Sequence, residues 1–389
     1  MMHELQKMWG RDKWAQVLLL VGIVCIGVTF AYASLVPADK NQPGYRISFA
    51  GDTYLGERAD AILMEKGHGW AIERLPKHDT DLFVYNAEAP LTSLPFPDDP
   101  NYHYPPGSNT PRYYVHTSRG KVKRYVTRSH PDAAGALADY GMDVATLSNN
   151  HALDLGPAGL SSTISALADV GISSIGAGLT DADAAAPYIA ESPHGRVGIF
   201  SFGEKGGTAP DATPQSAGIR VLNTANVDAA AAMAREQKID WLVAVVHWGN
   251  NYAPVLPTQQ KWAQRLAKRG FHLVVGHGPH VLQPVSLVAT KRRGLLGRMT
   301  HHTPVLYSLG NFSFQFPGRF TPEFPGYGVV ATAVLGPSGF REIQLTCIQT
   351  DNRIVNYQIR PCSDDDANRV LDDLWPGIEV IGATGTVRL

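Results

Sequence analysis

Polar and ionisable side chains follow six apolar, β-rich runs of this 389-residue chain, each at the point where the run ends. Because the carboxyl ends of parallel strands meet at one edge of a sheet, we expect these side chains to lie close together. They combine three carboxylates, four amides and four imidazoles: Asp52, Asn86, Glu88, Asn149, Asn150, His151, Asp154, His247, His277, His280 and Asn311. Imidazole, carboxylate and amide donors together suit Mn, Fe, Zn or Ni better than Ca or Mg.

Six or more donors of this kind are enough for one or two divalent ions. Two ions about 3.5–4 Å apart that share a carboxylate can generate hydroxide at neutral pH and hold both oxygens of an in-line phosphoryl displacement. A nearby histidine can protonate the leaving group. The pattern therefore predicts a metal-dependent, hydrolase-type site that uses Mn, Fe or Zn.

Each of these residues alone also has an ordinary structural explanation. Asp52 can be a turn residue, and Asp154 is interpreted mainly as a cap of the helix that Gly156 and Pro157 open. A single histidine at a strand end, such as His247, is more often a satisfied structural residue. It is the occurrence of polar donors at every strand end that favours a site.

The elements that must position these residues alternate along the chain. Expected strands are 45–50, 81–85, 143–147, 171–175, 196–202, 240–246, 272–275 and 304–309, and expected helices are 131–140, 157–170, 227–237 and 258–269. This alternation predicts an α/β fold in which helices cover apolar strands. Further on, 328–335, 340–348 and 354–359 predict an antiparallel set, followed by a closing helix over 363–375.

Seven motifs occur in the order found in one known family. They are Gly51-Asp52, Asn86-x-Glu88, Asn149-Asn150-His151-Ala152-Leu153-Asp154-x-Gly156, Gly176-Ala177-Gly178, His247-Trp248-Gly249, Gly276-His277-x-Pro279-His280 and Ser308-Leu309-Gly310-Asn311-Phe312. Over roughly residues 45–360 the chain resembles the CapA family of capsule and poly-gamma-glutamate synthesis proteins, which itself resembles the calcineurin-like metallophosphoesterases. The resemblance implies a metallophosphoesterase-like sandwich of two mixed β-sheets flanked by helices.

The resemblance also implies a role for each residue of the predicted site. Asp52 and His280 would bind the first metal, Glu88 would bridge, and Asn150, His247 and His277 would bind the second metal. His151 would be the general acid, while Asn86, Asn149, Asp154 and Asn311 would surround the ligands or touch the substrate. The chain departs from the usual motifs in three places. Tyr54 stands where a histidine is typical, and two residues instead of one separate His277 from His280. Either Asn86 or Glu88 stands where an aspartate is usual.

The N-terminal part of the chain contains an apolar run over 14–36, preceded by Lys7, Arg11 and Lys13. A helix of that length can span a bilayer, and the basic residues before it predict a cytoplasmic N-terminus at 1–13 with the remainder outside. The alternative is a signal peptide cleaved after Ala33. The predicted organisation continues with a linker over 37–44, a main domain over 45–362, and a helix and tail over 363–389.

Two cysteines follow the main strand runs. Cys347 and Cys362 are 15 residues apart, and outside the membrane they can either form a disulfide or remain two buried thiols.

The charges of the chain nearly balance, with 34 Lys and Arg against 35 Asp and Glu and a formal net charge of −1. This balance argues against general nucleic-acid binding. Two stretches that look like insertions, 92–129 and 286–303, are nevertheless basic. They contain the candidate polyanion-binding residues Lys121, Lys123, Arg124, Arg292 and Arg293, which can equally be a solvated surface.

The sequence thus favours an envelope-anchored protein of capsule or poly-gamma-glutamate synthesis or export, with a metal-dependent hydrolase-type site facing outside. The resemblance implies an anionic polymer such as poly-gamma-glutamate and membrane synthase subunits as partners. Two alternatives remain open: a free-standing metal-dependent phosphoesterase and a non-catalytic polymer-binding scaffold.

Overall fold

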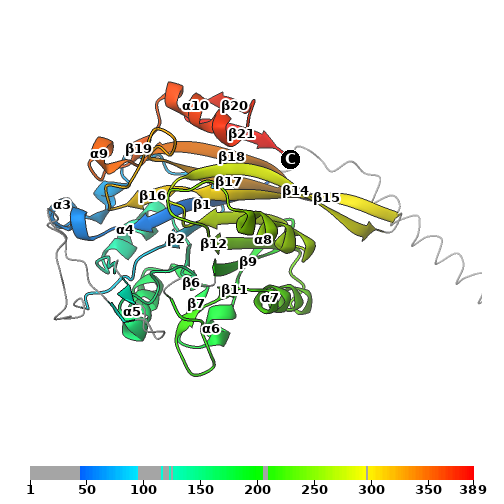
Figure 1. Cartoon of the computed structure of the whole chain (residues 1–389), viewed down its shortest axis with the longest axis horizontal. Helices are drawn as coiled ribbons and strands as arrows, with labels where there is room; N and C mark the ends of the chain where they lie inside the picture. The colour runs from blue at the N-terminus through cyan, green and yellow to red at the C-terminus, as the bar shows by residue number, and fades with distance from the viewer. Residues whose placement is uncertain (1–43, 95–114, 117–121, 124–125, 205–208, 295–296) are drawn as a thin grey trace, which may run out of the picture. The chain divides into compact units, whose positions relative to one another are not determined.

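Two mixed β-sheets form the centre of the fold (Figure 1). The computed structural model describes residues 44–389 except 95–114, 117–121, 124–125, 205–208 and 295–296. The predicted membrane span at 14–36 and the alternative signal peptide therefore lie outside the described residues. Within the described part of the chain, no helix is both long enough and apolar enough to cross a bilayer.

The first sheet has ten strands, and its order is β20-β21-β18-β17-β1-β2-β5-β6. Its parallel half consists of β1 (Tyr45–Tyr54), β2 (Leu82–Ala87), β5 (Val144–Thr146) and β6 (Ser173–Ile175). Its antiparallel half consists of β17 (Tyr327–Gly336), β18 (Gly339–Gln349), β20 (Glu379–Ile381) and β21 (Thr384–Arg388). Two short strands complete it, β16 (Asn311–Phe314) beside β1 and β19 (Arg360–Pro361) beside β18.

The second sheet has seven strands in the order β11-β9-β12-β13-β15-β14, with β8 beside β9. The strands are β8 (Tyr188–Ser192), β9 (Gly195–Glu204), β11 (Val221–Leu222), β12 (Trp241–His247), β13 (Leu273–His277), β14 (Leu282–Gly294) and β15 (Gly297–Leu309). Two small two-stranded antiparallel sheets pair β3 (Val115–His116) with β4 (Val122–Lys123) and β7 (Ala177–Gly178) with β10 (Gly218–Ile219).

Side chains that alternate along the strands pack the two sheets against each other. On β12, Val243 and Val245 join the same buried cluster as Phe49 and Val84 of the first sheet, whereas Ala244 belongs to a cluster on the opposite face. Strands buried on both faces read as continuous apolar runs, which is why these runs stand out in the sequence. The α/β sandwich of two mixed sheets predicted from the sequence is confirmed.

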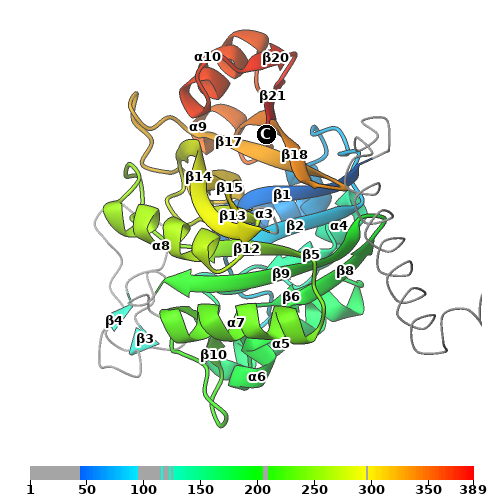
Figure 2. The same cartoon turned by 90° about the vertical axis from the view of Figure 1, so that its right-hand side faces the viewer.

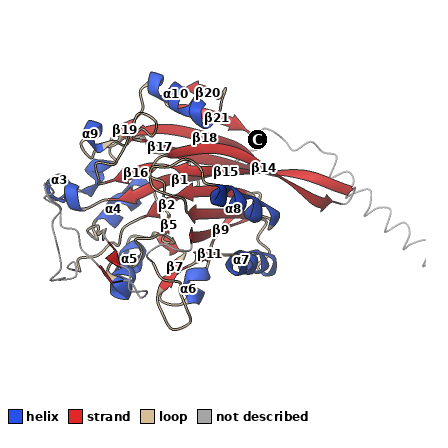
Figure 3. Cartoon of the chain, in the orientation of Figure 1, coloured by secondary structure: helices blue, strands red, loops and turns tan. Residues whose placement is uncertain are grey.

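Helices cover both outer faces of the sandwich, as the colouring by secondary structure shows (Figure 3). The outer face of the first sheet packs against α3 (Asp60–Lys66), α4 (Ala133–Tyr140) and α5 (Gly156–Asp169). The outer face of the second sheet packs against α7 (Thr224–Glu236) and α8 (Pro257–Lys268). The remaining short elements are η1 (Glu57–Ala59), η2 (His68–Ala71), α6 (Asp181–Ala185) and α9 (Asn352–Val355).

The C-terminal part of the chain differs from the expected helix and tail. The helix exists as α10 (Asp364–Leu374), with Ser363 as its N-cap. The residues after it form β20 and β21, which extend the first sheet beside β18 and lie next to α10 (Figure 2). These residues lack a strong strand pattern, and it is the pairing of β21 with β18 and of β20 with β21 that makes them strands.

The strand predicted over 354–359 is wrong. Asp351 caps the short helix α9 here, and Asn356 and Tyr357 follow with φ angles of 48° and 67°. Two consecutive left-handed residues cannot continue an extended strand.

The basic stretch 286–303 is a long β-hairpin, β14–β15, that extends beyond the neighbouring strands (Figure 1). Its backbone register places Arg292 opposite Met299 and Arg293 opposite Arg298. In the other basic stretch, Lys121 and Arg124 lie outside the described residues, and Lys123 is in β4. Polyanion binding by these five residues stays a prediction.

Cys347 and Cys362 form a disulfide that ties β18 to the segment just after β19, with Cα atoms 5.5 Å apart. Both cysteines are buried in the cluster between the sheets. Of the two alternatives left open by the sequence, the structure therefore has the disulfide.

Removing this disulfide by a Cys347→Ala/Cys362→Ala double substitution should lower the free energy of unfolding by about 2–4 kcal/mol. The reason is that the cross-link limits the freedom of the unfolded chain, and it closes a loop of 15 residues. Urea unfolding followed by fluorescence measures the effect. Wild-type protein treated with a reductant is the control, and an unfolding midpoint that the reductant leaves unchanged would contradict the prediction.

Candidate metal centre

The Asp52 carboxylate is placed by an irregularity at the end of β1. The register with β2 shifts between Ala50 and Asp52, and Asp52 is fully buried. Its backbone N–H donates to the Gly310 carbonyl at 3.0 Å. A Cβ atom on Gly51 would lie 2.1 Å from that same carbonyl oxygen, so only glycine lets the two segments approach this closely.

Asn86 and Glu88 come from the end of the neighbouring strand β2. The side-chain amide of Asn86 donates to Asp52 Oδ1 at 2.8 Å and to Glu88 Oε2 at 3.3 Å. Glu88 is fully buried, and its Oε1 lies 3.1 Å from His247 Nε2 and 3.8 Å from His280 Nε2. Asn86 therefore holds the two carboxylates through its hydrogen bonds, and Glu88 lies beside the histidines.

His277 and His280 come from the end of β13 in the second sheet. Gly278 has a φ of 107° and donates its backbone N–H to Asp52 Oδ2 at 3.2 Å, while His280 itself has a φ of 60°. Nδ1 of His280 lies 3.1 Å from both Asp52 Oδ2 and Asn311 Oδ1. The left-handed turn thus brings imidazoles of one sheet against carboxylates of the other, and side-chain atoms of Asp52, Glu88 and His280 lie within 4.8 Å of one another.

Burial and mutual charge determine the protonation of these groups. Burial alone would raise the pKa of Asp52, but the hydrogen bond from His280 and the charges of neighbouring histidines hold it below its usual range. Burial alone would lower the pKa of His280, but Glu88 and Asp52 raise it to about 9. Burial lowers the pKa of His277 to about 4, because the favourable charge of Asp52 does not compensate. His277 is therefore a neutral imidazole at physiological pH.

The residues present fit a divalent transition-metal ion. Two buried carboxylates and three imidazoles converge from both sheets, which is the donor chemistry that such ions prefer. Nδ1 of His277 is buried, lies 3.6 Å from Asp52 Oδ1 and makes no hydrogen bond with any described residue. An unsatisfied nitrogen in such a place is costly unless a ligand uses it. Asp52, Glu88, His247, His277 and His280 are the residues that would hold an ion.

Metal binding should release about one proton per protein near pH 7.5. His280 carries a proton between two carboxylates when no ion is bound, since its pKa is raised to about 9, and a ligating imidazole must lose that proton. Affinity for Zn or Mn should therefore rise with pH up to about 9 and then level off. Calorimetry in two buffers of different ionisation enthalpy measures the release, and an enthalpy that does not depend on the buffer would contradict it.

His151 lies in the turn after β5, and its Nδ1 is 2.7 Å from Asp154 Oδ2. The same carboxylate oxygen accepts hydrogen bonds from the Thr127 backbone N–H at 2.7 Å and hydroxyl at 3.0 Å. The interpretation of Asp154 as a helix cap is wrong, because α5 has Leu155 at its N-cap without a side-chain hydrogen bond. Asp154 instead orients an imidazole. Thr127 was missed because it lies inside a stretch that looks like an insertion.

A chain of hydrogen bonds connects the His151 turn to the carboxylates. The His151 backbone N–H donates to Asn149 Oδ1 at 3.0 Å, and the Asn149 amide donates to Asn86 Oδ1 at 3.1 Å and to the Ala87 carbonyl at 2.8 Å. Asn86 in turn donates to Asp52 and Glu88. The predicted residues Asn86, Asn149 and Asp154 thus support the other side chains. Asn150 lies between Asn149 and His151, and its role as a ligand stays a prediction.

Tyr54 occupies the position where the related motif carries histidine. It is buried and packs its ring against Phe314 at 5.4 Å and Phe316 at 5.8 Å between centroids. Tyr54 therefore contributes aromatic packing beside the centre, whereas a histidine at this position would contribute a metal ligand.

These observations define an α/β sandwich with a buried carboxylate–histidine centre at the carboxyl ends of strands from both sheets. Residues 46–315 match the family described as bacterial capsule synthesis protein PGA_cap. The chain belongs to this family.

Individual proteins of similar sequence point to the same family. A probable polyglutamine synthesis accessory protein of Mycobacterium tuberculosis is 28% identical over 299 residues, covering 70% of this chain and 75% of its own. The PGA biosynthesis protein CapA of Bacillus subtilis is 24% identical over 277 residues, covering 69% and 63%. The capsule biosynthesis protein CapA of Bacillus anthracis is 24% identical over 311 residues, covering 77% and 68%.

Among solved structures, the NAD nucleotidase NadN of Haemophilus influenzae aligns over 84% of this chain and 55% of its own, with 10% identity and a TM-score of 0.40. A phosphatase from Mycoplasma pneumoniae aligns over 80% and 96%, with 11% identity and the same TM-score. TM-scores of this size do not establish a shared fold.

Proposed function

We propose that this protein acts on an anionic capsular polymer, such as poly-gamma-glutamate, through a divalent-metal-dependent hydrolase-type site. The observation that carries the proposal is the convergence of Asp52, Glu88, His247, His277 and His280 in a chain of the capsule synthesis family. A scaffold that only bound polymer would have no need of two fully buried carboxylates facing three imidazoles, because burying such charges is costly.

A bound Mn, Fe or Zn ion would polarise the oxygen of the bond to be cleaved and lower the pKa of water. The chain's own residues would do the rest. Asp52 and Glu88 balance positive charge, and Asn86 fixes the orientation of both carboxylates.

His151 is the residue placed to move a proton. Asp154 accepts from its Nδ1, which fixes the ring orientation and leaves Nε2 as the atom that gives a proton to the leaving group. Thr127 supports this arrangement through its two hydrogen bonds to Asp154.

We further propose that the site works outside the cytoplasm, anchored by the apolar segment 14–36. The Cys347–Cys362 disulfide supports this location, because disulfides persist in oxidising compartments. Membrane subunits that synthesise or export the polymer are the proposed partners.

The test combines biology with chemistry. Deleting the coding sequence should abolish extracellular polymer, and the purified protein with Mn, Fe or Zn should cleave a γ-linked glutamate oligomer. Polymer production unchanged by the deletion would refute the role in capsule synthesis. Cleavage of bis(p-nitrophenyl) phosphate without cleavage of the oligomer would favour the second candidate, a phosphoesterase, which the same donor set supports.

A further inference from the structure

Two exposed arginines lie on aromatic rings beside the metal centre. The Arg319 guanidinium carbon lies 5.0 Å from the centroid of the Tyr252 ring, and that of Arg58 lies 5.8 Å from the centroid of the Phe316 ring. Both arginines are exposed to solvent. Cation–π contacts of this kind hold a guanidinium in place while its N–H groups stay free to bind.

The ring beneath Arg319 contacts His280, and the ring beneath Arg58 is connected to His280 through Phe314. The Tyr252 ring centroid is 5.9 Å from that of His280, and the Phe314 centroid is 4.6 Å from it. Phe314 in turn contacts Phe316 at 6.4 Å. The charges of Asp52 and Glu88 also reach the Tyr252 hydroxyl and contribute to its raised pKa, after burial as the main cause. Both guanidinium groups therefore lie one or two rings away from the centre.

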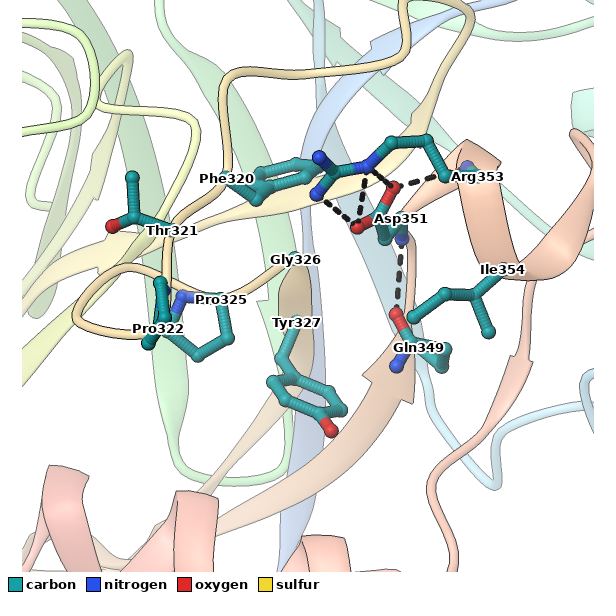
Figure 4. A pocket seen from close by; sticks show the side chains of 10 residues that line it. All are labelled: Phe320, Thr321, Pro322, Pro325, Gly326, Tyr327, Gln349, Asp351, Arg353 and Ile354. Atoms are coloured by element: carbon teal, nitrogen blue, oxygen red, sulfur yellow. Dashed lines mark hydrogen bonds and ion pairs between the residues drawn. The ribbon is translucent and has the colours of Figure 1, made fainter.

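Neither arginine forms an ion pair with a carboxylate whose side chain the structure describes. Arg353, by contrast, is paired with a carboxylate. It lines a pocket of about 310 Å³ together with Phe320 (Figure 4). Its guanidinium binds both oxygens of Asp351, with Nε at 2.9 and 3.1 Å. The positive charge in that pocket is neutralised by a carboxylate of the chain itself, whereas the charges of Arg58 and Arg319 are available to a ligand.

The segment that carries Arg319 is fixed at several points. The side-chain amide of Asn352 donates to the carbonyls of Phe314 and Phe316 at 2.6 and 2.7 Å. Gly318 has a φ of 65°, and a Cβ atom there would lie 2.2 Å from the Phe320 ring. Such anchoring places a guanidinium with little loss of entropy on binding.

We propose that Arg319 and Arg58 bind carboxylate groups of a polyanionic substrate chain and so hold it against the metal centre. This inference rests on the proposed function and names the groups that would recognise its substrate. Guanidinium is suited to the task because its planar N–H donors match the two oxygens of a carboxylate. Two such positions beside one centre select a chain with several carboxylates over a molecule with a single charge.

The test measures binding of a fluorescein-labelled γ-linked glutamate octamer to the full-length protein by anisotropy, at two salt concentrations. Arg319→Gln and Arg58→Gln should each weaken binding about tenfold, as expected for the loss of a charge-assisted hydrogen bond. The two effects should roughly multiply in the double variant, and the loss should shrink at high salt. A fully amidated, uncharged octamer should bind equally weakly to all variants.

Arg265→Gln is the matched control. Arg265 is also exposed and lies over an aromatic ring, 4.7 Å from the Trp262 centroid, but it belongs to the last turn of α8, away from the carboxyl ends of the strands. Its variant should bind the octamer within twofold of wild type. An unchanged affinity in Arg319→Gln, no binding by wild type, or an equal loss in Arg265→Gln would each overturn the inference.

Metal content measured on the same samples separates this inference from the function on which it rests. The arginine variants should retain the metal of the wild type, because neither residue is a proposed ligand. If the wild-type protein contains no metal but still binds the octamer through these arginines, the proposed metal-dependent hydrolysis is refuted. The inference that the arginines recognise an anionic chain is then still supported.

Discussion

Replacing His151 by glutamine should lower turnover by about 10²–10⁴-fold while the protein keeps its metal and its fold. A positioned proton donor contributes an effect of that size, and glutamine cannot transfer a proton. His151 is buried and is fixed through Asp154 and Asn149, so the substitution removes the transferable proton with little rearrangement. Initial rates with the γ-linked glutamate oligomer and with bis(p-nitrophenyl) phosphate measure the loss.

The Asp154→Asn variant provides the companion test. It keeps the shape of the side chain but weakens the control over the His151 ring, so turnover should fall less than in His151→Gln, and the pH profile should shift. Turnover in His151→Gln equal to that of wild type would show that the proton comes from elsewhere.

Replacing Asp52 by asparagine should weaken metal binding at least about 100-fold and remove activity with it. Loss of a supporting group alone costs about 10–100-fold in metal affinity, and Asp52 is proposed as a direct ligand. Its carboxylate is fully buried and faces His277 and His280. After the substitution, Glu88 is the one described carboxylate of the centre that remains to balance the charge of the ion. Competition with a fluorescent chelator measures the affinity.

Asp143→Asn is a matched control for this prediction. Asp143 precedes β5, so it lies at the amino end of that strand, and its carboxylate accepts the Phe83 backbone N–H at 2.7 Å. The variant can lose some stability, but it should bind metal as wild type does. Equal metal affinity in Asp52→Asn and wild type would remove Asp52 from the ligand set.

The candidate site could be predicted from the sequence largely because the chain obeys a simple rule of α/β sheets. Apolar runs buried on both faces are visible as strands, and polar residues directly after them must lie at the carboxyl edge. Asp52, Glu88, His247 and His277 were found in this way, and the structure brings them together. Their individual roles as ligands stay predictions.

The rest depends on contacts between residues far apart in the sequence. Thr127 supports His151 from a stretch that has no recognisable strand or helix pattern, and Asp154 looks like a cap because of the glycine and proline that follow it. The strand β21 exists because β18 offers an edge to pair with, and β20 pairs in turn with β21. The residues Arg58 and Arg319 could not be related to the site, since only the folded chain places their rings beside His280.

Metal content is the measurement that tests the central claim most directly. Mass spectrometry on the purified protein, supplied with Mn, Fe and Zn, should find one or two equivalents of a transition metal. A His247→Ala/His277→Ala variant should lose metal, because it removes two of the three imidazoles that face the buried carboxylates. No bound metal in the wild type under any of these conditions would contradict the account.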